Sequence, residues 1–266
     1  MLQLIPWWVQ QKVWVYEFWR DKKLTTEPSL RGRGKRYKQS VKDIEHGRHY
    51  NVDEAIELLK LASSVKFDET FELHLRTNAD PRHADQQIRS VSVLPHGTGK
   101  AKTVIAFVQG SAVALARESG ADFIGDEETI KRIETEGWVD FDVAIATPDV
   151  MGQIGKLGRV LGRKGLMPNP RTGTVVQPED IGAAINEVKQ GRVEFRMDRS
   201  GNIHVAIGKV SFQNSQVAEN LFTVVGAITR AKPDGIKGSL FKSIHLTTTM
   251  GPSISLDIGS VQNASI

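Results

Sequence analysis

Two short segments that lie far apart in the sequence carry the side chains best suited to bind a polar ligand. They are Lys66-Phe-Asp-Glu-Thr-Phe-Glu-Leu-His74 and Ser243-Ile-His-Leu-Thr-Thr-Thr-Met-Gly-Pro-Ser253. In both, apolar and polar residues alternate with the period of a half-buried strand, so we expect the polar residues to face outward. We expect the second strand to run through Thr249 into a tight turn at Met250-Gly251-Pro252, where glycine permits a positive φ and close backbone approach. Neither segment has the residues of an active site, which favours binding over catalysis.

At these residues the chain closely resembles the bacterial L-one family of large-subunit ribosomal proteins. The resemblance extends from about Gly34 to about Asp257. It takes in further ordered matches, which are Asn78-Ala-Asp-Pro-Arg82, Ser92-Val-Leu-Pro-His-Gly97, Ala144-Ile-Ala-Thr-Pro-Asp-Val-Met-Gly152, Leu161-Gly-Arg-Lys-Gly-Leu-Met-Pro-Asn-Pro170 and Gly191-Arg-Val-Glu-Phe-Arg196.

This resemblance implies a structural constituent of the large ribosomal subunit. Such a protein binds 23S rRNA, forms the mobile stalk near the tRNA exit site and assists the release of deacylated tRNA. It also implies repression of translation from the protein's own operon mRNA. The implied partners are large-subunit rRNA, exit-site tRNA, that mRNA and other ribosomal components. We expect a cytoplasmic, ribosome-bound protein that is a monomer off the ribosome, with no membrane association, enzymatic activity, cofactor or metal.

The resemblance also assigns RNA contacts to particular side chains. They are Lys66, Phe67, Thr70, Glu72, His74, Arg196, Ser243, Thr249, Met250 and Gly251. Lys66 could contact a phosphate, and the hydroxyls of Thr70 and Ser243 could donate to sugar or phosphate oxygens. Glu72 repels phosphate, so we expect its carboxylate to accept from a 2′-OH or a base amino group. Phe67 could stack on a base or, by its place in the alternation, join the core.

Positive charge is concentrated at the N-terminus. The chain has 266 residues and a net charge of +4, with a pI of about 9.2. Residues 1–40 hold nine Lys and Arg against Glu17, Asp21 and Glu27, a net of +6, which leaves 4 − 6 = −2 for the remainder. RNA affinity in the body must therefore come from a local surface and its shape. The absence of cysteine excludes a disulfide framework and suits a reducing compartment.

Residues 1–33 have no counterpart in the family pattern. They hold four of the five tryptophans. Their charges lie within the apolar part, whereas a signal peptide has its positive charges before it, so we exclude a signal peptide. The same charges interrupt any run of the roughly 20 apolar residues that a membrane span needs. We interpret the segment as an overextended start site; the alternative is an added arm that binds RNA or a partner. The basic residues that follow, Lys35, Arg36 and Lys38, could contact phosphate backbone or lie in solvent.

The hydrophobic periodicity predicts where the helices and strands lie. Asn51 with Glu54 predicts a capping box at the start of a helix. Strands are expected at 67–76, 91–94, 103–108, 122–124, 143–146, 193–197 and 203–207 and around Ile244, and helices at 111–119, 127–136, 178–190 and 216–231. Between 101 and 190, apolar strands alternate with helices, which is typical of a parallel sheet covered on both faces.

These elements indicate a mixed fold, α/β and α+β, in two domains. An α+β RNA-binding domain is expected from both chain ends, residues 34–97 plus 192–266. A Rossmann-like parallel α/β domain, residues 98–191, is inserted into it, with Gly97, Gly99 and Gly191 as the hinge. The composition suggests this division and the resemblance implies it.

Three patterns could be mistaken for other chemistry. Gly97-Thr-Gly-Lys100 lacks the spacing and the hydroxyl of a phosphate loop, which weakens the alternative of a nucleotide-binding enzyme built on the α/β domain. Five glycines interleaved with cations between 152 and 165 predict a flexible basic loop, in which Arg163 and Lys164 could touch RNA or tRNA. Asp140, Asp142 and Asp149 are expected to be strand-end caps and not metal ligands.

Overall fold

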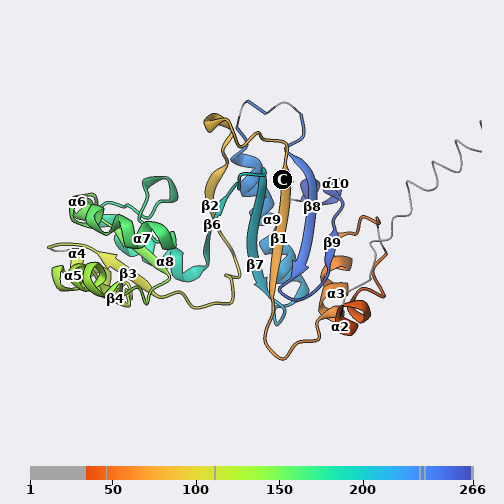
Figure 1. Ribbon diagram of the computed structural model, residues 1–266, viewed down its shortest axis with the longest axis horizontal. Coiled ribbons are helices and arrows are strands. Elements are labelled where there is room, and N and C mark those ends of the chain that lie inside the picture. Colours follow the sequence, from red (N-terminus) through yellow and green to blue (C-terminus); the bar gives the residue numbers. More distant parts are fainter. Residues whose placement is uncertain (1–33, 46, 111, 234, 237, 265–266) are drawn as a thin grey trace, which may run out of the picture.

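The structure is a computed structural model, and it describes residues 34–264 except 46, 111, 234 and 237. The expectations for residues 1–33, including the tryptophans, lie outside the described residues. The chain folds around two separate sheets and a two-stranded ribbon between them (Figure 1). The fold is mixed α/β, with one parallel and one antiparallel main sheet, as the sequence predicts.

The larger sheet is antiparallel and has four strands. Its order is β7-β1-β8-β9, from Asn202–Lys209, Thr70–Thr77, Phe241–Thr248 and Ser253–Ser255. The two central strands come from opposite halves of the chain, and β1 pairs with both β7 and β8. Both chain ends therefore build one sheet. The short edge strand β9 is not predicted by the sequence.

One face of this sheet packs on helices. These are α3 (Val52–Ala62), α9 (Asn214–Arg230) and α10 (Ile258–Ala264). The apolar residues of β1 are buried in the same core as the helices; they are Phe71, Leu73 and Leu75. This confirms the prediction, made from the alternation, that these residues face inward. The predicted capping box at the start of α3 is wrong: Asn51 is the N-cap residue but makes no side-chain cap hydrogen bond. Glu54 instead bonds Arg48 at 2.8 Å.

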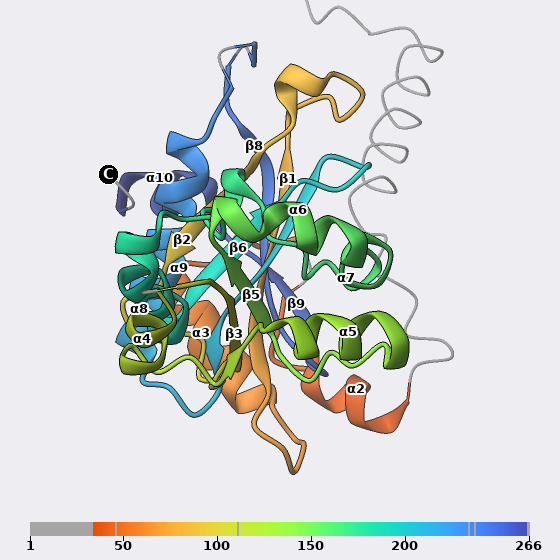
Figure 2. The ribbon, with the colours of Figure 1, turned by 90° about the vertical axis from the view of Figure 1, so that its left-hand side faces the viewer.

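The inserted part is a parallel sheet with helices on both faces. Its order is β4-β3-β5, from Phe123–Ile124, Val104–Phe107 and Val143–Ala146. Helices α4 (Ala112–Glu118) and α8 (Ile181–Gln190) cover one face, and α5 (Glu127–Glu136) and α7 (Gly158–Lys164) cover the other (Figure 2). Alternate residues of β3 enter two different cores, which explains its continuous apolar run.

The predicted flexible basic loop between 152 and 165 is helical. It contains α6 (Met151–Ile154), a 3₁₀ turn η3 (Gly155–Leu157) and α7. Ile154, Leu157 and Leu161 are fully buried against the sheet, and this apolar face stabilises the helices despite their glycines. The basic residues between them are on the opposite, exposed side.

The remaining elements are short. The strands β2 (Arg89–Val93) and β6 (Arg192–Arg196) form the two-stranded ribbon, which contacts α9 and β7. Near the start of the described chain, α2 spans Lys35–Ser40. Single 3₁₀ turns are η1 (Ala84–Gln86), η2 (Pro148–Val150), η4 (Pro170–Thr172) and η5 (Pro178–Asp180).

The chain crosses between the two parts twice, and glycines meet where it does so. Gly97, Gly99 and Gly191 have φ of +66°, +72° and +112°. A Cβ on Gly191 would lie 2.3 Å from the Gly97 Cα, so a side chain at Gly191 would force the two crossings apart.

Asn220 of α9 fixes the first crossing to the larger sheet. It is completely buried, and its amide donates to Gly97 O at 3.0 Å and Ile207 O at 2.8 Å. Its Oδ1 accepts from the His96 N–H at 3.2 Å. One side chain thus satisfies three backbone groups that have come from two different segments.

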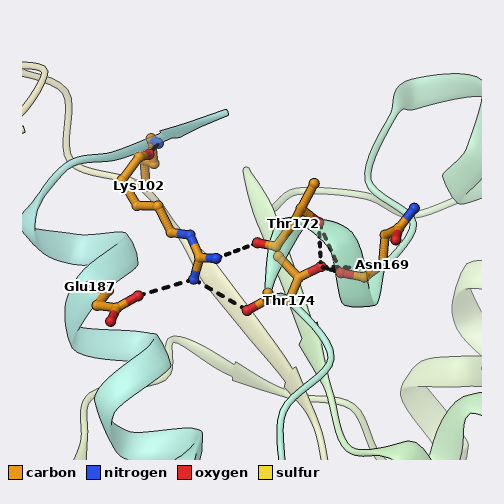
Figure 3. Close-up of polar contacts among 7 residues, drawn as sticks. Lys102, Asn169, Thr172, Thr174 and Glu187 are labelled. Atoms are coloured by element: carbon orange, nitrogen blue, oxygen red, sulfur yellow. Dashed lines mark hydrogen bonds and ion pairs between the residues drawn. The ribbon is translucent and has the colours of Figure 1, made fainter. Parts of the chain in front are cut away.

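Arg192 fixes the second crossing to the inserted part. Although it begins β6, its guanidinium bonds the carbonyls of Thr172 and Gly173 and lies 3.2 Å from Glu187 of α8. Lys102 donates to the Arg192 carbonyl. Figure 3 shows Glu187, Thr172 and Lys102 around this point. In the turn that supplies the carbonyls, the hydroxyls of Thr172 and Thr174 bond Asn169 O at 3.0 and 3.2 Å.

Replacing Asn220 by Ala should destabilise the protein by about 2–4 kcal/mol, because it leaves buried backbone groups without partners. Urea unfolding of the variant measures this change. Ser215→Ala, at an exposed position of the same helix, is the control and should stay within about 0.5 kcal/mol of the parent. Equal stability of the two variants would contradict the role given to Asn220.

Candidate nucleic-acid interface

The two segments with ligand-binding side chains lie side by side. Strands β1 and β8 are antiparallel neighbours in which Phe71, Glu72 and His74 face Thr248, Thr247 and His245. Residues up to 179 positions apart in the sequence thus form one surface. The polar residues of these strands lie on the face opposite the helices, and they are half-buried or exposed.

Thr70 and Thr249 join the ends of the two strands. The Thr70 N–H donates to Thr249 Oγ1 at 3.0 Å, and the Thr249 N–H donates to Thr70 O at 3.1 Å. Lys209 Nζ donates to Thr70 Oγ1 at 2.8 Å. These bonds hold the exposed segment Thr249-Met250 against the start of β1 and leave the second lone pair of Thr70 Oγ1 able to accept.

Large side chains stand out beside this junction. Met250 is 49% exposed and Phe67 is 54% exposed, and Lys66 next to it is exposed too. The expectation that β1 begins at Phe67 is wrong, and so is the option of Phe67 in the core. The strand begins at Thr70 because its register starts there with β7 and at Phe71 with β8. Phe67 is therefore an exposed aromatic ring shortly before the start of β1, where a base could stack.

Gly251 is required by close packing and not by its φ. The positive φ that glycine permits is not used here, since Gly251 is not among the glycines with positive φ. A Cβ at this position would lie 2.2 Å from Thr248 Oγ1, in the turn where the Gly251 N–H bonds Thr248 O. β8 also ends at Thr248, one residue earlier than expected. The turn thus brings bare backbone to the surface beside Met250.

Glu72 and His74 lie in the middle of the outward face. His74 Nε2 is 3.7 Å from Glu72 Oε2 and its Nδ1 is 2.8 Å from Nδ1 of His204 on β7. Partial burial lowers the pKa of His74, and the neighbouring His204 lowers it further, while Glu72 acts in the opposite direction. The carboxylate of Glu72 is half-exposed, so it can accept hydrogen bonds from a ligand.

The other predicted residues lie elsewhere. Ser243 is at the far end of β8, roughly 20 Å from Thr249 at the rise of a strand, where it pairs with Arg76. Arg196 is on the β2–β6 ribbon opposite Arg89 and is exposed. Three cations are exposed on α2, and two more at the end of α7 in the inserted part. They are Lys35, Arg36 and Lys38, and Arg163 and Lys164.

Sequence reasoning missed two buried polar groups beneath the junction. Glu69 and Thr248 are 1% and 2% exposed, and within the described chain Glu69 Oε2 and Thr248 Oγ1 lack hydrogen-bond partners. Glu69 directly precedes β1, at a position of the alternation where the strand's other residues are apolar. A carboxylate at an apolar position of an alternating segment is the signal that could have identified it.

The patterns set aside as decoys have ordinary structural roles. Lys100 Nζ bonds Asp142 at 2.8 Å, and Thr103 N–H also donates to that carboxylate. These bonds, first that of Lys100, lower the pKa of Asp142. Asp140 accepts from Trp138 Nε1 at 2.7 Å. The described residues include no group of three or more acids, His or Cys placed to hold a metal ion. Among their helices, none combines the length and apolar character of a membrane span.

Comparison with known proteins finds one matching family and several similar proteins of one name. Residues 58–252 match the Ribosomal protein L1p/L10e family. The large ribosomal subunit protein uL1 of Chloroflexus aggregans is 53% identical over 230 residues, which cover 86% of this chain and 97% of that protein. The proteins of the same name from Thermomicrobium roseum and Dehalococcoides mccartyi are 51% and 52% identical over 228 residues each. The coverage is 85% and 86% of this chain and 94% and 96% of those proteins.

Gly251→Ala should destabilise the protein by about 1–3 kcal/mol, because the new methyl group overlaps the buried Thr248 hydroxyl. In a Thr248→Ala background the nearest atom is the Thr248 Cβ at 3.5 Å, so the same change should cost much less. Thermal or urea unfolding of the four proteins of this double-mutant cycle measures the coupling. Additive effects of the two changes would rule out the proposed overlap.

Proposed function

The chain belongs to the Ribosomal protein L1p/L10e family, and from this relationship we propose that it is a structural protein of the large ribosomal subunit that binds 23S rRNA through paired strands β1 and β8. We assign the RNA-binding role to residues 34–97 plus 192–266, and a mobile role to the inserted residues 98–191. In line with this family, we propose that the protein has a structural function and no enzymatic activity.

The pairing of β1 with β8 is the observation that carries this proposal. It places Thr70, Glu72, Thr249 and Met250 on one accessible surface. The surface offers a carboxylate acceptor, hydroxyl groups, bare backbone at Gly251 and an exposed thioether. These groups suit an irregular RNA fold, which is recognised through 2′-OH groups, unstacked bases and shape.

Charge supports specific rather than general RNA binding. Beyond residue 40 the chain has a net charge of −2, so phosphate attraction over the whole body cannot supply the affinity. A carboxylate such as Glu72 in the contact surface would penalise any RNA that does not present a donor to it. We therefore infer recognition of a particular folded segment of rRNA.

The further roles concern the rest of the molecule. The inserted part would form the mobile end of the stalk near the tRNA exit site and help to release deacylated tRNA, with Arg163 and Lys164 facing the tRNA. Gly97, Gly99 and Gly191 would be the hinge, since all three lie at the crossings with positive φ. An RNA fold in the operon mRNA that resembles the rRNA site would allow the protein to repress its own synthesis. Off the ribosome we propose a monomer in the cytoplasm.

The protein should bind an isolated 23S rRNA stalk fragment with high specificity over a random RNA of equal length. A filter-binding or fluorescence titration of both RNAs, at one fixed salt concentration, provides the measurement. A chain that begins at Gly34 should retain this specificity, because the proposed contacts lie beyond that residue. Equal affinity for the two RNAs would reject the proposed function.

Met250→Ala should weaken the rRNA complex by about 1–3 kcal/mol, the range typical of a lost buried contact. Leu115→Ala is a matched control, because Leu115 is 43% exposed but lies on α4 of the inserted part. It should leave the affinity unchanged. If both variants lost affinity equally, or neither did, the assignment of the site to the β1–β8 junction would fail.

A further inference from the structure

The outward face of the larger sheet carries three histidines in one row across neighbouring strands. In the strand register, His74 on β1 lies opposite both His204 on β7 and His245 on β8. His245 lies in turn opposite Ser255 on β9, whose hydroxyl is 3.2 Å from its Nδ1. The row crosses the whole sheet. Only His74 was singled out from the sequence, because strand pairing brings the other two to it from 130 residues away and more.

The rings of His74 and His204 form a hydrogen-bonded pair. Their Nδ1 atoms are 2.8 Å apart, and their centroids are 4.9 Å apart in an edge-to-face arrangement. Two ring nitrogens at this distance share one hydrogen, which one Nδ1 donates and the other accepts. If both rings were fully protonated, both Nδ1 atoms would be donors and the contact would break. The pair can therefore take up one proton, but not two, without a change of geometry.

The surroundings of the row can hold that positive charge. Glu72 Oε2 is 3.7 Å from His74 Nε2, and Asp198 Oδ2 is 3.7 Å from His204 Nε2. Beyond these two acids, other titratable groups border the row along the strands and in the pocket beside His245. They are Arg76 on β1, Lys209 on β7, and Glu45, Arg48 and His49 beside β8 and β9.

In the free protein the surroundings of His74 and His245 favour the neutral form of both rings. Partial burial lowers the pKa of His74 and of His245, and each has a histidine neighbour that lowers it further, His204 and His49 respectively. Both groups therefore lie below the ordinary histidine pKa of about 6.5. A phosphate docked against the His74–His204 pair would favour its singly protonated form.

We propose that the histidine row extends the RNA-binding surface across the sheet, and that the His74–His204 pair takes up one proton when an RNA phosphate docks against it. This inference rests on the proposed function, because the anion belongs to the bound rRNA. The proton comes from solvent and stays on a ring nitrogen. A complex that holds more protons than its free components binds more tightly as the pH falls, by up to about tenfold per pH unit for one full proton.

The test measures the affinity of the full chain for the 23S rRNA stalk fragment at pH 8, 7 and 6 and constant ionic strength. Affinity should rise about three- to tenfold from pH 8 to pH 6. The double variant His74→Gln, His204→Gln should lose most of this rise. His83→Gln, an exposed histidine before η1, is the control and should keep it. A double variant with the parent's pH dependence would overturn the proposal.

Calorimetry of the unaltered protein gives a second readout that does not depend on the variants folding. Binding heats in two buffers of different ionisation enthalpy should reveal net proton uptake near pH 6.5. Specific binding without proton uptake would overturn this inference and leave the proposed function intact. If the protein shows no preference for the stalk fragment over a random RNA at any of these pH values, both this inference and the proposed function are overturned.

Discussion

The antiparallel pairing of β1 with β8 is the interaction on which the rest of the structure depends. Their ladder fixes which residues face the helices and which face outward, since a slip of one residue would reverse every side chain. On the inner side it places Leu73 and Leu246 in one core with α3 and α9. On the outer side it aligns Glu72 with Thr247 and His74 with His245. The same register therefore determines both the composition of the core and the composition of the outward surface.

The inserted part keeps its own cores and meets the sheet through two fixed crossings. Asn220 belongs to the sheet part but binds the first crossing, whereas Arg192 enters β6 but binds the inserted part. Gly97, Gly99 and Gly191, which have positive φ, lie at these two crossings. Any change in the relative orientation of the two parts must therefore be absorbed at few backbone positions, while the cores of both parts stay intact.

The sequence predicted the elements better than their limits and contacts. Helix α5 and strand β5 have the expected bounds, because each is a single periodic segment ended by glycine or a polar turn. The helices between Met151 and Lys164 were missed because frequent glycines conceal the spacing of Ile154, Leu157 and Leu161. The start of β1 was misplaced because a strand's length depends on its partners, which lie more than 120 residues away.

The candidate site shows the same division. Alternation was sufficient to predict that Thr70, Glu72 and His74 face outward, and the shared surface with Thr249 and Met250 followed only from strand pairing. The role of Gly251 could not be read from the sequence, since it depends on the position of one hydroxyl group in the preceding turn. The histidine row was hidden for a related reason: each member alone is an ordinary strand residue.

The hydrogen bonds between Thr70 and Thr249 close a loop of 179 residues. During synthesis the inserted sheet, with its strands and helices contiguous in the chain, can fold while the polypeptide is still growing. The surface beside Met250 cannot form until Thr249 has left the ribosome and bonded Thr70. A chain that stops before Thr249 would therefore possess a folded inserted part yet lack the junction that holds the proposed RNA-binding surface together.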